Sequence, residues 1–334
     1  MCRKLVGFRV VFGFVDDQWR FSLAERLHPP VLRFSSALFA SYVMCLWGSS
    51  DEDHERRQHE LSPQSRTRFF IDVAQENRRV FRDLMVADER LRNSPHTSTL
   101  YRYTEPLAHT AIQEDIQPMK SASIRVVAMD SLDAAYELYR SGVEDIVVLN
   151  MANEEHPGGG YLSGAGAQEE ALCRRSSLYA TLSGNHTFYP IPPHGAIYSP
   201  DVLVIRKSDD EACEPLSEEE RWWTSVVSAA AIFHPQVNES GMEFARTEDR
   251  EDTRERIKTV LRVAALEGKR NLVLSALGCG AFRNPPMAVA QLFKEVSTDH
   301  EFQGRFQRIW FSILDRRGSQ NYQIFQHVLG ELQI

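Results

Sequence analysis

The feature that most constrains this chain is a glycine-rich loop between an apolar run and a helical pattern. The apolar run, residues 145–149, ends at Asn150, and three adjacent glycines at 158–160 precede a helix expected from Gln168. Strand, glycine loop and helix in this order are typical of α/β proteins, which hold phosphorylated ligands at the carboxyl ends of their strands. Ordering three glycines costs conformational entropy. The loop therefore predicts either a phosphate or sugar close to the backbone or a structural turn.

Two adjacent carboxylates, Glu169 and Glu170, lie at the expected start of this helix. A helix N-terminus favours negative charge by about 0.3–1 kcal/mol, so both residues can be structural. Successive helical side chains diverge by about 100°, which argues against one facing pair. If the site is catalytic, we expect one carboxyl group to transfer protons and the other to hold substrate.

A second glycine loop repeats the arrangement. It spans residues 278–282 after the apolar run 271–277, and Asn284 followed by Pro285 is typical of an N-cap and a first helical position. The two loops could meet at one sheet edge and hold a diphosphate, or they could be two independent turns.

Two side chains of the second loop allow more than one interpretation. Cys279 resembles a thiol nucleophile, but no histidine is positioned by sequence to activate it, so its small size between glycines is the preferred explanation. Phe282 is either a core residue or a ligand contact.

Composition narrows the class of protein. The 334 residues are 43% hydrophobic and 25% charged, as in a globular protein with a sizeable core. The formal net charge of −8, without a basic block, argues against direct nucleic-acid binding. Five scattered cysteines without a Cys-x-x-Cys pair, and eleven scattered histidines, predict neither a disulfide framework nor a metal site. We expect no cofactor and an intracellular location, in the nucleus, the cytoplasm or both.

Alternating strand and helix patterns predict an α/β fold whose largely parallel sheet is covered on both faces. The expected strands cover residues 123–129, 145–149, 196–205 with an interruption at Pro200, 226–233, 271–277 and 308–314. The expected helices cover residues 131–140, 168–182, 249–267, 285–296 and 321–332. The charged segment 207–220 is expected to be a surface insertion.

The N-terminal part differs from this pattern. Residues 1–61 are expected to be a poorly ordered extension, within which the apolar segment 31–47 is shorter than the roughly 20 residues of a membrane span. A protein starting at Met44 should therefore keep its fold. Residues 62–120 are expected to form a helical extension on the core, 121–334, with residues 88–120 as an irregular connector. One helical face should pack on the core; it comprises Phe70, Val73, Ala74, Asn77 and Phe81.

The motifs of the first loop resemble those of a known family. Pro-Gly-Gly-Gly at 157–160, then seven residues, then Gln168-Glu169-Glu170 is similar to the signature of the poly(ADP-ribose) glycohydrolases. Asn150-Met-Ala-Asn153 resembles the Asn-Ala-Ala-Asn stretch of macrodomains. The run from Glu169 to Tyr179 is most similar to the microbial-type enzymes of bacteria and filamentous fungi. The resemblance spans roughly residues 65–330 and implies a macrodomain-like three-layer sandwich.

The resemblance also implies an activity and residue roles. The activity is hydrolysis of ribose–ribose O-glycosidic bonds in poly(ADP-ribose), mainly from chain ends, as part of ADP-ribosylation reversal in the DNA damage response. Glu170 would protonate the leaving oxygen and then activate water, Glu169 would hold ribose hydroxyls, and Asn153 would fix the distal ribose. The remaining residues implied in substrate binding are Gly158, Gly159, Gly160, Gln168, Gly278, Cys279, Gly280, Ala281 and Phe282.

A macrodomain that binds ADP-ribose without cleaving it is the alternative. Such modules have the glycine loops without Gln-Glu-Glu, so Glu169 and Glu170 favour the enzyme. The expected partners are poly(ADP-ribose) and ADP-ribosylated proteins, with no direct nucleic acid and no membrane. We expect the protein to be a monomer.

Overall fold

The computed structural model describes residues 10–15, 18–23, 62–106, 122–315, 318–330 and 332. The chain divides into two compact units, Met1–Asp53 and His54–Ile334. In the first, β1 (Val10–Val15) pairs antiparallel with β2 (Gln18–Leu23). The expectations for residues 31–47 and Met44 lie outside the described residues.

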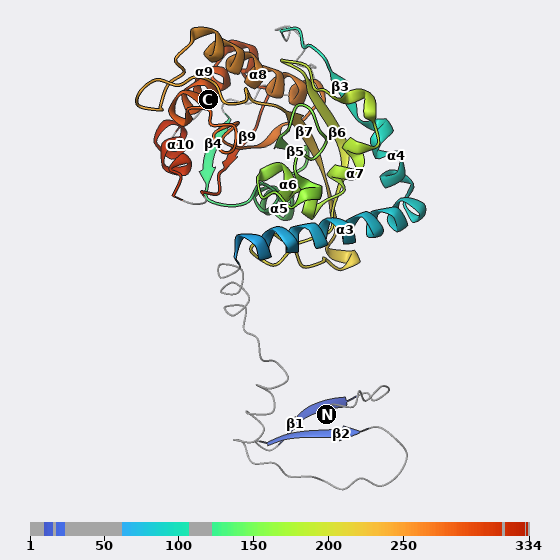
Figure 1. Ribbon diagram of the computed structural model, residues 1–334. Helices are drawn as coiled ribbons and strands as arrows, with labels where there is room; N and C mark the ends of the chain where they lie inside the picture. Colours follow the sequence, from blue (N-terminus) through green and yellow to red (C-terminus); the bar gives the residue numbers. More distant parts are fainter. Residues whose placement is uncertain are drawn as a thin grey trace. The chain divides into compact units, whose positions relative to one another are not determined.

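The described strands of the second unit form one seven-stranded sheet in the order β3-β6-β7-β5-β8-β9-β4 (Figure 1). The strands from β7 to β4 run parallel, while β6 is antiparallel to both of its neighbours. The bounds are β3 (Thr99–Tyr101), β4 (Ser123–Val127), β5 (Ile146–Met151), β6 (Ala196–Val204), β7 (Trp222–Ala229), β8 (Asn271–Leu274) and β9 (Arg308–Ser312). The predicted α/β fold with a mostly parallel sheet is confirmed.

Helices cover both faces of the sheet because alternate strand residues point to opposite sides. One face packs on α8, α9 and α10 through residues such as Leu149, Leu274 and Phe311, and the other packs on α5, α6 and α7 through residues such as Val148 and Val273. Figure 1 shows these two helical layers, which make the macrodomain-like three-layer sandwich. The helix bounds are α3 (Pro63–Ala87), α4 (Glu89–Thr97), α5 (Ser131–Arg140), α6 (Gln168–Arg175), α7 (Leu178–Ser183), α8 (Thr247–Leu266), α9 (Pro286–Ser297) and α10 (Asn321–Leu329).

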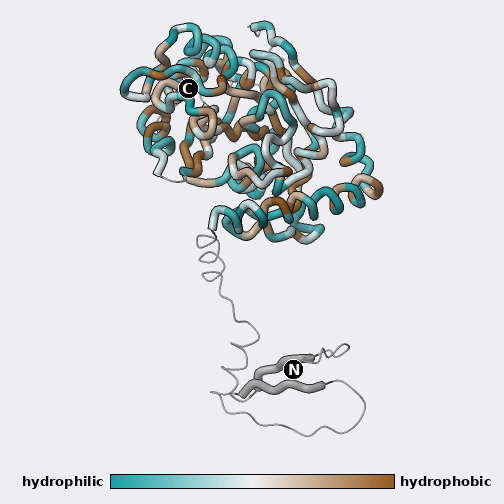
Figure 2. The backbone as a smooth tube through the Cα atoms, viewed as in Figure 1, coloured by the Kyte–Doolittle hydropathy of each residue, from teal (hydrophilic) through white to brown (hydrophobic). Residues whose placement is uncertain are grey.

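The long helix α3 packs against the domain with the face that its sequence predicts. Its buried residues are Phe70, Val73, Ala74, Asn77 and Phe81. Hydrophilic and hydrophobic residues alternate along this helix (Figure 2). It contacts the first glycine loop directly, since a Cβ at Gly164 would lie 2.4 Å from the carbonyl oxygen of Thr67. The boundaries proposed at residues 61 and 120 stay predictions.

Several local expectations were wrong. The supposed connector 88–120 contains α4 and β3, and β3 pairs with β6. The expected helix 168–182 is broken at Ser176, whose backbone is extended and whose hydroxyl accepts from the Leu178 N–H. Serine side chains compete in this way with helical hydrogen bonds. The segment 207–220 is not merely a surface insertion, because its Asp209 is buried.

Two further boundaries differ from expectation, and both differences concern the site. The strand expected over 226–233 ends at Ala229, so Phe233 belongs to a loop. The N-cap of α9 is Pro285 rather than Asn284, whose side chain makes other contacts described below. By contrast, the interruption expected at Pro200 is confirmed as a register shift in β6 between Ser199 and Val202.

Candidate active site

The two glycine loops meet at one edge of the sheet. The strands that precede them, β5 and β8, are parallel neighbours, with Val148 opposite Val273. On its other side β5 pairs with β7, with Met151 opposite Ala229, so a third loop, residues 230–246, begins at the same edge. From the sequence, the meeting of the first two loops was one of two possibilities, and the third loop was missed.

Glu170 is held by the loop that precedes its helix. One carboxylate oxygen accepts from the Gly160 N–H at 2.8 Å, and the other accepts from the Ala167 N–H at 2.9 Å. The Ala167 contact caps the first turn of α6, where negative charge is favoured. The side chain is buried, at 6% exposure. Glu170 therefore orders the loop as well as facing the site.

Glu169 is also buried, at 3% exposure, and it contacts the end of β5. Its carboxylate accepts from the Asn153 N–H at 2.7 Å and from the Asn150 side-chain amide at 3.3 Å. Burial raises the pKa of Glu169 to about 8, although these hydrogen bonds and one from the Gly158 N–H oppose the increase. A carboxyl group with this pKa carries a proton at neutral pH.

Both carboxylates converge on Gly159. A Cβ there would lie 2.7 Å from an oxygen of Glu170 and 2.9 Å from an oxygen of Glu169. The expectation that the two carboxyl groups cannot face the same point was therefore wrong. The two side chains leave the helix in different directions, but each is long enough to return to the same loop. Gly159 also has φ +54°, which disfavours any other residue.

The neighbouring glycines are packed in the same way. A Cβ at Gly158 would lie 2.8 Å from the ring of Tyr179, and one at Gly160 would lie 2.6 Å from Cβ of Ala165. The first loop thus needs glycine because its own side chains occupy the space. Its backbone N–H groups are occupied too, since Gly158 and Gly160 donate to the carboxylates and Gly159 donates to the carbonyl of His156.

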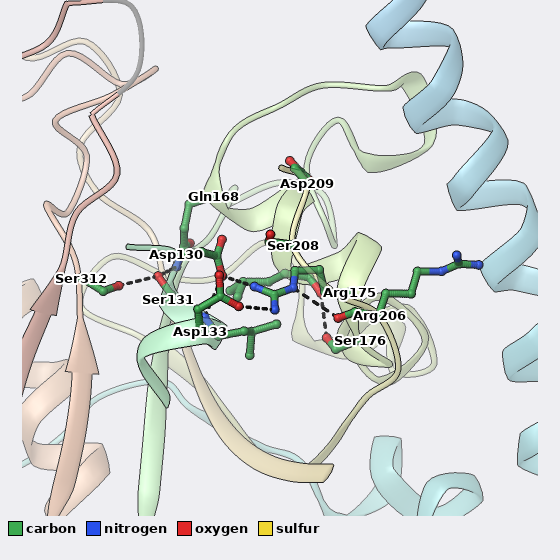
Figure 3. Close-up of polar contacts among 12 residues, drawn as sticks. Asp130, Ser131, Asp133, Gln168, Arg175, Ser176, Arg206, Ser208, Asp209 and Ser312 are labelled. Atoms are coloured by element: carbon green, nitrogen blue, oxygen red, sulfur yellow. Dashed lines mark hydrogen bonds and ion pairs between the residues drawn. The ribbon is translucent and has the colours of Figure 1, made fainter. Parts of the chain in front are cut away.

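Gln168 joins the helix to the sheet rather than facing a ligand. Its amide oxygen accepts from the Met151 N–H at 2.9 Å, and its amide nitrogen donates to the carbonyl of Leu149 at 2.7 Å. The same nitrogen contacts the hydroxyl of Ser131, which contacts that of Ser312 (Figure 3). These contacts link α6 to the ends of β5 and β9.

Asn153 orders the start of the first loop. Its side-chain oxygen accepts from the N–H groups of Glu155 and His156, both at 2.9 Å. The amide nitrogen donates to no acceptor among the described residues. It is therefore available to a ligand.

Asn284 organises the second loop. Its side-chain nitrogen donates to the carbonyl of Ile232 at 2.8 Å, in the third loop, and to the carbonyl of Gly278 at 3.3 Å. A Cβ at Gly278, where φ is +74°, would lie 2.4 Å from that nitrogen. Sequence analysis identified this asparagine as an N-cap and missed its link between loops.

The tip of the second loop presents unpaired backbone donors. Within the described part of the chain, the N–H groups of Gly280, Ala281 and Phe282 donate no hydrogen bond. Gly280 and Ala281 are exposed, and a Cβ at Gly280 would meet nothing within 4 Å. Successive free N–H groups of this kind form concave sites for anions.

An aromatic cluster borders this tip. The ring of Phe282 meets that of Phe233 edge to face at 5.1 Å, and Phe233 stacks on His234 at 4.2 Å. Phe233 is 62% exposed. Phe282 therefore joins an open aromatic surface, of which only Phe282 was singled out from the sequence. Burial raises the pKa of the Cys279 thiol, which supports the structural interpretation of that residue.

Three buried arginines, two of them at the end of α6, were also missed. Arg174 is fully buried, forms a bidentate ion pair with Asp209 and donates to the carbonyl of Ala165 at 2.7 Å. Arg175 pairs with Asp130 and Asp133 (Figure 3). The third, Arg206, bonds Asn77 of α3. Pairing makes such burial tolerable, and the network anchors the helix that carries both glutamates.

The described residues contain no group of three or more histidine, cysteine or acidic side chains placed to hold a metal ion. No helix in the described ranges is long and apolar enough to cross a membrane.

Comparison with known proteins shows which proteins these features resemble. Residues 74–207 match the family model described as the catalytic domain of microbial-type PARG. The solved poly(ADP-ribose) glycohydrolase (PARG) of Thermomonospora curvata is 28% identical, and the match covers 78% of this chain and 98% of that one, with a TM-score of 0.63. No curated protein matched.

Two ligand-bound structures are also similar. The Thermomonospora curvata enzyme bound to the inhibitor ADP-HPD is 28% identical over 77% of this chain and 98% of its own, with a TM-score of 0.61. The Deinococcus radiodurans enzyme in complex with ADP-ribose is 28% identical over 72% and 96%, with a TM-score of 0.56. By the match of residues 74–207 and by its fold, the chain is similar to the microbial-type poly(ADP-ribose) glycohydrolases.

Proposed function

We propose that the protein hydrolyses the ribose–ribose O-glycosidic bonds of poly(ADP-ribose) and releases ADP-ribose, mainly from chain ends. The observation that carries this proposal is the convergence of two buried carboxylates, Glu169 and Glu170, at the same sheet edge as a second loop with free backbone donors. Glycoside hydrolysis needs a proton for the leaving oxygen and a base for water, and two carboxyl groups supply both.

The two glutamates have separate roles in this proposal. Glu170 protonates the leaving ribose oxygen and then activates water, and Glu169 holds ribose hydroxyls. The raised pKa of Glu169 means that the pair holds a proton at neutral pH before substrate arrives.

The ligand would lie across the three loops. Asn153 offers its free amide to the ribose next to the scissile bond, and the N–H groups of residues 280–282 receive the diphosphate. The rings of Phe282 and Phe233 offer an exposed surface on which a base or ribose can stack. The first loop positions the carboxylates of Glu169 and Glu170 and does not bind phosphate, because its N–H groups are already hydrogen-bonded.

The expected location and assembly remain part of the proposal. Cys173, Cys213 and Cys279 are free thiols, which supports a reducing compartment, the nucleus or the cytoplasm. The proposed partners are poly(ADP-ribose) and ADP-ribosylated proteins, which the protein binds as substrates. We expect the protein to be a monomer that binds neither nucleic acid directly nor a membrane.

The deciding experiment incubates purified protein with automodified poly(ADP-ribose) and measures released ADP-ribose. Release that stops with mono-ADP-ribose on the carrier protein supports the proposal. Tight ADP-ribose binding without any release would replace it by the alternative, a non-catalytic reader of ADP-ribose.

A further inference from the structure

Asn150 lies beneath Glu169 at the end of the central strand β5. It is fully buried, and its side-chain nitrogen donates to a carboxylate oxygen of Glu169 at 3.3 Å and to the hydroxyl of Ser228 on β7 at 3.0 Å. Both amide protons are thus used within the protein. Since Asn150 is enclosed by these groups, its amide acts on Glu169 rather than on a ligand.

The other half of this amide has no partner. The side-chain oxygen of Asn150 is buried and accepts no hydrogen bond from the described residues. An unpaired buried acceptor costs about 1–3 kcal/mol. A half-turn of the amide would exchange the unpaired oxygen for an unpaired nitrogen. Either orientation of the amide therefore leaves one of its atoms unpaired. Which orientation is favoured depends on whether the facing oxygen atoms of Glu169 and Ser228 donate or accept a proton.

We propose that Asn150 is a positioning residue that holds Glu169 in both of its protonation states. With Glu169 ionised, the amide nitrogen donates to the carboxylate, as observed. With Glu169 protonated, the amide turns and its oxygen accepts the carboxyl proton. Ser228 allows both orientations because a hydroxyl can donate or accept. The proposal rests on the proposed function, in which Glu169 must keep one position while the pair loses and regains a proton.

Among the described residues, no other side chain that hydrogen-bonds Glu169 can make this exchange. The remaining partners of the carboxylate are the N–H groups of Asn153 and Gly158, which only donate. The titratable groups that face Glu169 are Glu170 and Cys173 of α6 and Tyr189 of the segment after α7. Burial raises the pKa of both Cys173 and Tyr189, so neither becomes charged near neutral pH.

The test measures kcat/KM on poly(ADP-ribose) against pH for wild type, Asn150→Ala, Asn150→Asp and the control Ser228→Ala. Ionisation of Glu169 removes the proton that the pair holds at neutral pH, so it gives the wild-type profile a falling limb. Asn150→Ala removes a hydrogen bond from both forms of Glu169, but the charge-assisted bond to the ionised form is the stronger, so the midpoint of that limb should move up by about one pH unit. The shift should be larger in Asn150→Asp, in which two carboxyl groups share a proton. Ser228→Ala keeps the contact with Glu169 and should keep the wild-type midpoint.

A uniform loss of kcat/KM at every pH, with an unmoved midpoint, would overturn the proposal and leave Asn150 a structural residue. Thermal unfolding against pH gives a second readout that needs no turnover. The deficit in Tm of Asn150→Asp relative to wild type should grow as pH rises, since both carboxyl groups then ionise. A constant deficit would contradict the proposal. If wild type itself releases no ADP-ribose, the proposed function fails, and this second readout still decides the role of Asn150.

Discussion

The two glycine loops share a sequence pattern and use it in opposite ways. In the first, the positions where side chains would project are filled by Glu169, Glu170 and Tyr179, and the glycine N–H groups are bonded internally. In the second, the space at Gly280 is open and three N–H groups are free. Glycine thus admits the protein's own carboxylates in one loop and exposes the backbone in the other. Adjacent glycines alone therefore do not indicate which group approaches the chain.

Glu170→Gln should give the largest effect. If Glu170 transfers the proton, the rate of ADP-ribose release should fall by about 10²- to 10⁴-fold. Both of its oxygens accept from backbone N–H groups, so the amide of glutamine must place a donor against a donor. We therefore also expect a loss of stability of about 1–3 kcal/mol. As a control, the affinity for ADP-ribose is measured by calorimetry. An affinity within about tenfold of wild type shows that the binding loops keep their structure. Near-normal turnover would disprove the assignment.

Substitution of matched glycines tests the comparison directly. Gly159→Ala places a methyl group against both carboxylates at positive φ, so the cost in stability should exceed about 1 kcal/mol and hydrolysis should collapse. Gly280→Ala adds the same methyl group in open space and should change stability by less than about 0.5 kcal/mol. Chemical denaturation and the release assay measure both variants. Equal effects at the two positions would show that the loops do not differ as described.

Asn284→Ala should loosen the second loop without disturbing the first. It removes the side-chain donor to the carbonyls of Ile232 and Gly278, at an expected cost of about 1–3 kcal/mol. If residues 280–282 bind the diphosphate, ADP-ribose affinity should fall more than the stability of the whole fold. Calorimetry and thermal unfolding together test this. Unchanged affinity would mean that the free N–H groups are not a binding site.

The last prediction concerns the pH dependence of stability. Glu169 has a pKa raised from 4.5 to about 8. Its neutral form therefore contributes stability that is complete below pH 4.5 and is lost as pH rises through 8. Glu169→Gln cannot ionise, so the stability of this variant relative to wild type should increase with pH across that window. Parallel curves of unfolding free energy against pH would show that Glu169 titrates normally.

The layered fold could be predicted from the sequence because helical periodicity and apolar runs are local signals. The predicted inner face of α3 matched its five buried residues, and the register shift near Pro200 followed from one proline. The ends of helices that depend on competing hydrogen bonds could not be predicted from the sequence. Ser176 ends α6 because its backbone pairs with Val204, far along the chain. The end of β7 at Ala229 was missed because the apolar run continues into the third loop.

By itself, the sequence determined the layered α/β fold and the glycine-loop motifs, since both follow from short-range patterns of residue type, and it left open whether the two loops meet. Only the tertiary structure decided what the glycines make room for. It brought Glu169 and Glu170 back to Gly159, placed Asn150 beneath one of them and left the N–H groups of the second loop free. Those outcomes depend on which distant groups fill each space and satisfy each hydrogen bond, and the buried arginine network that holds α6 is built from such partners.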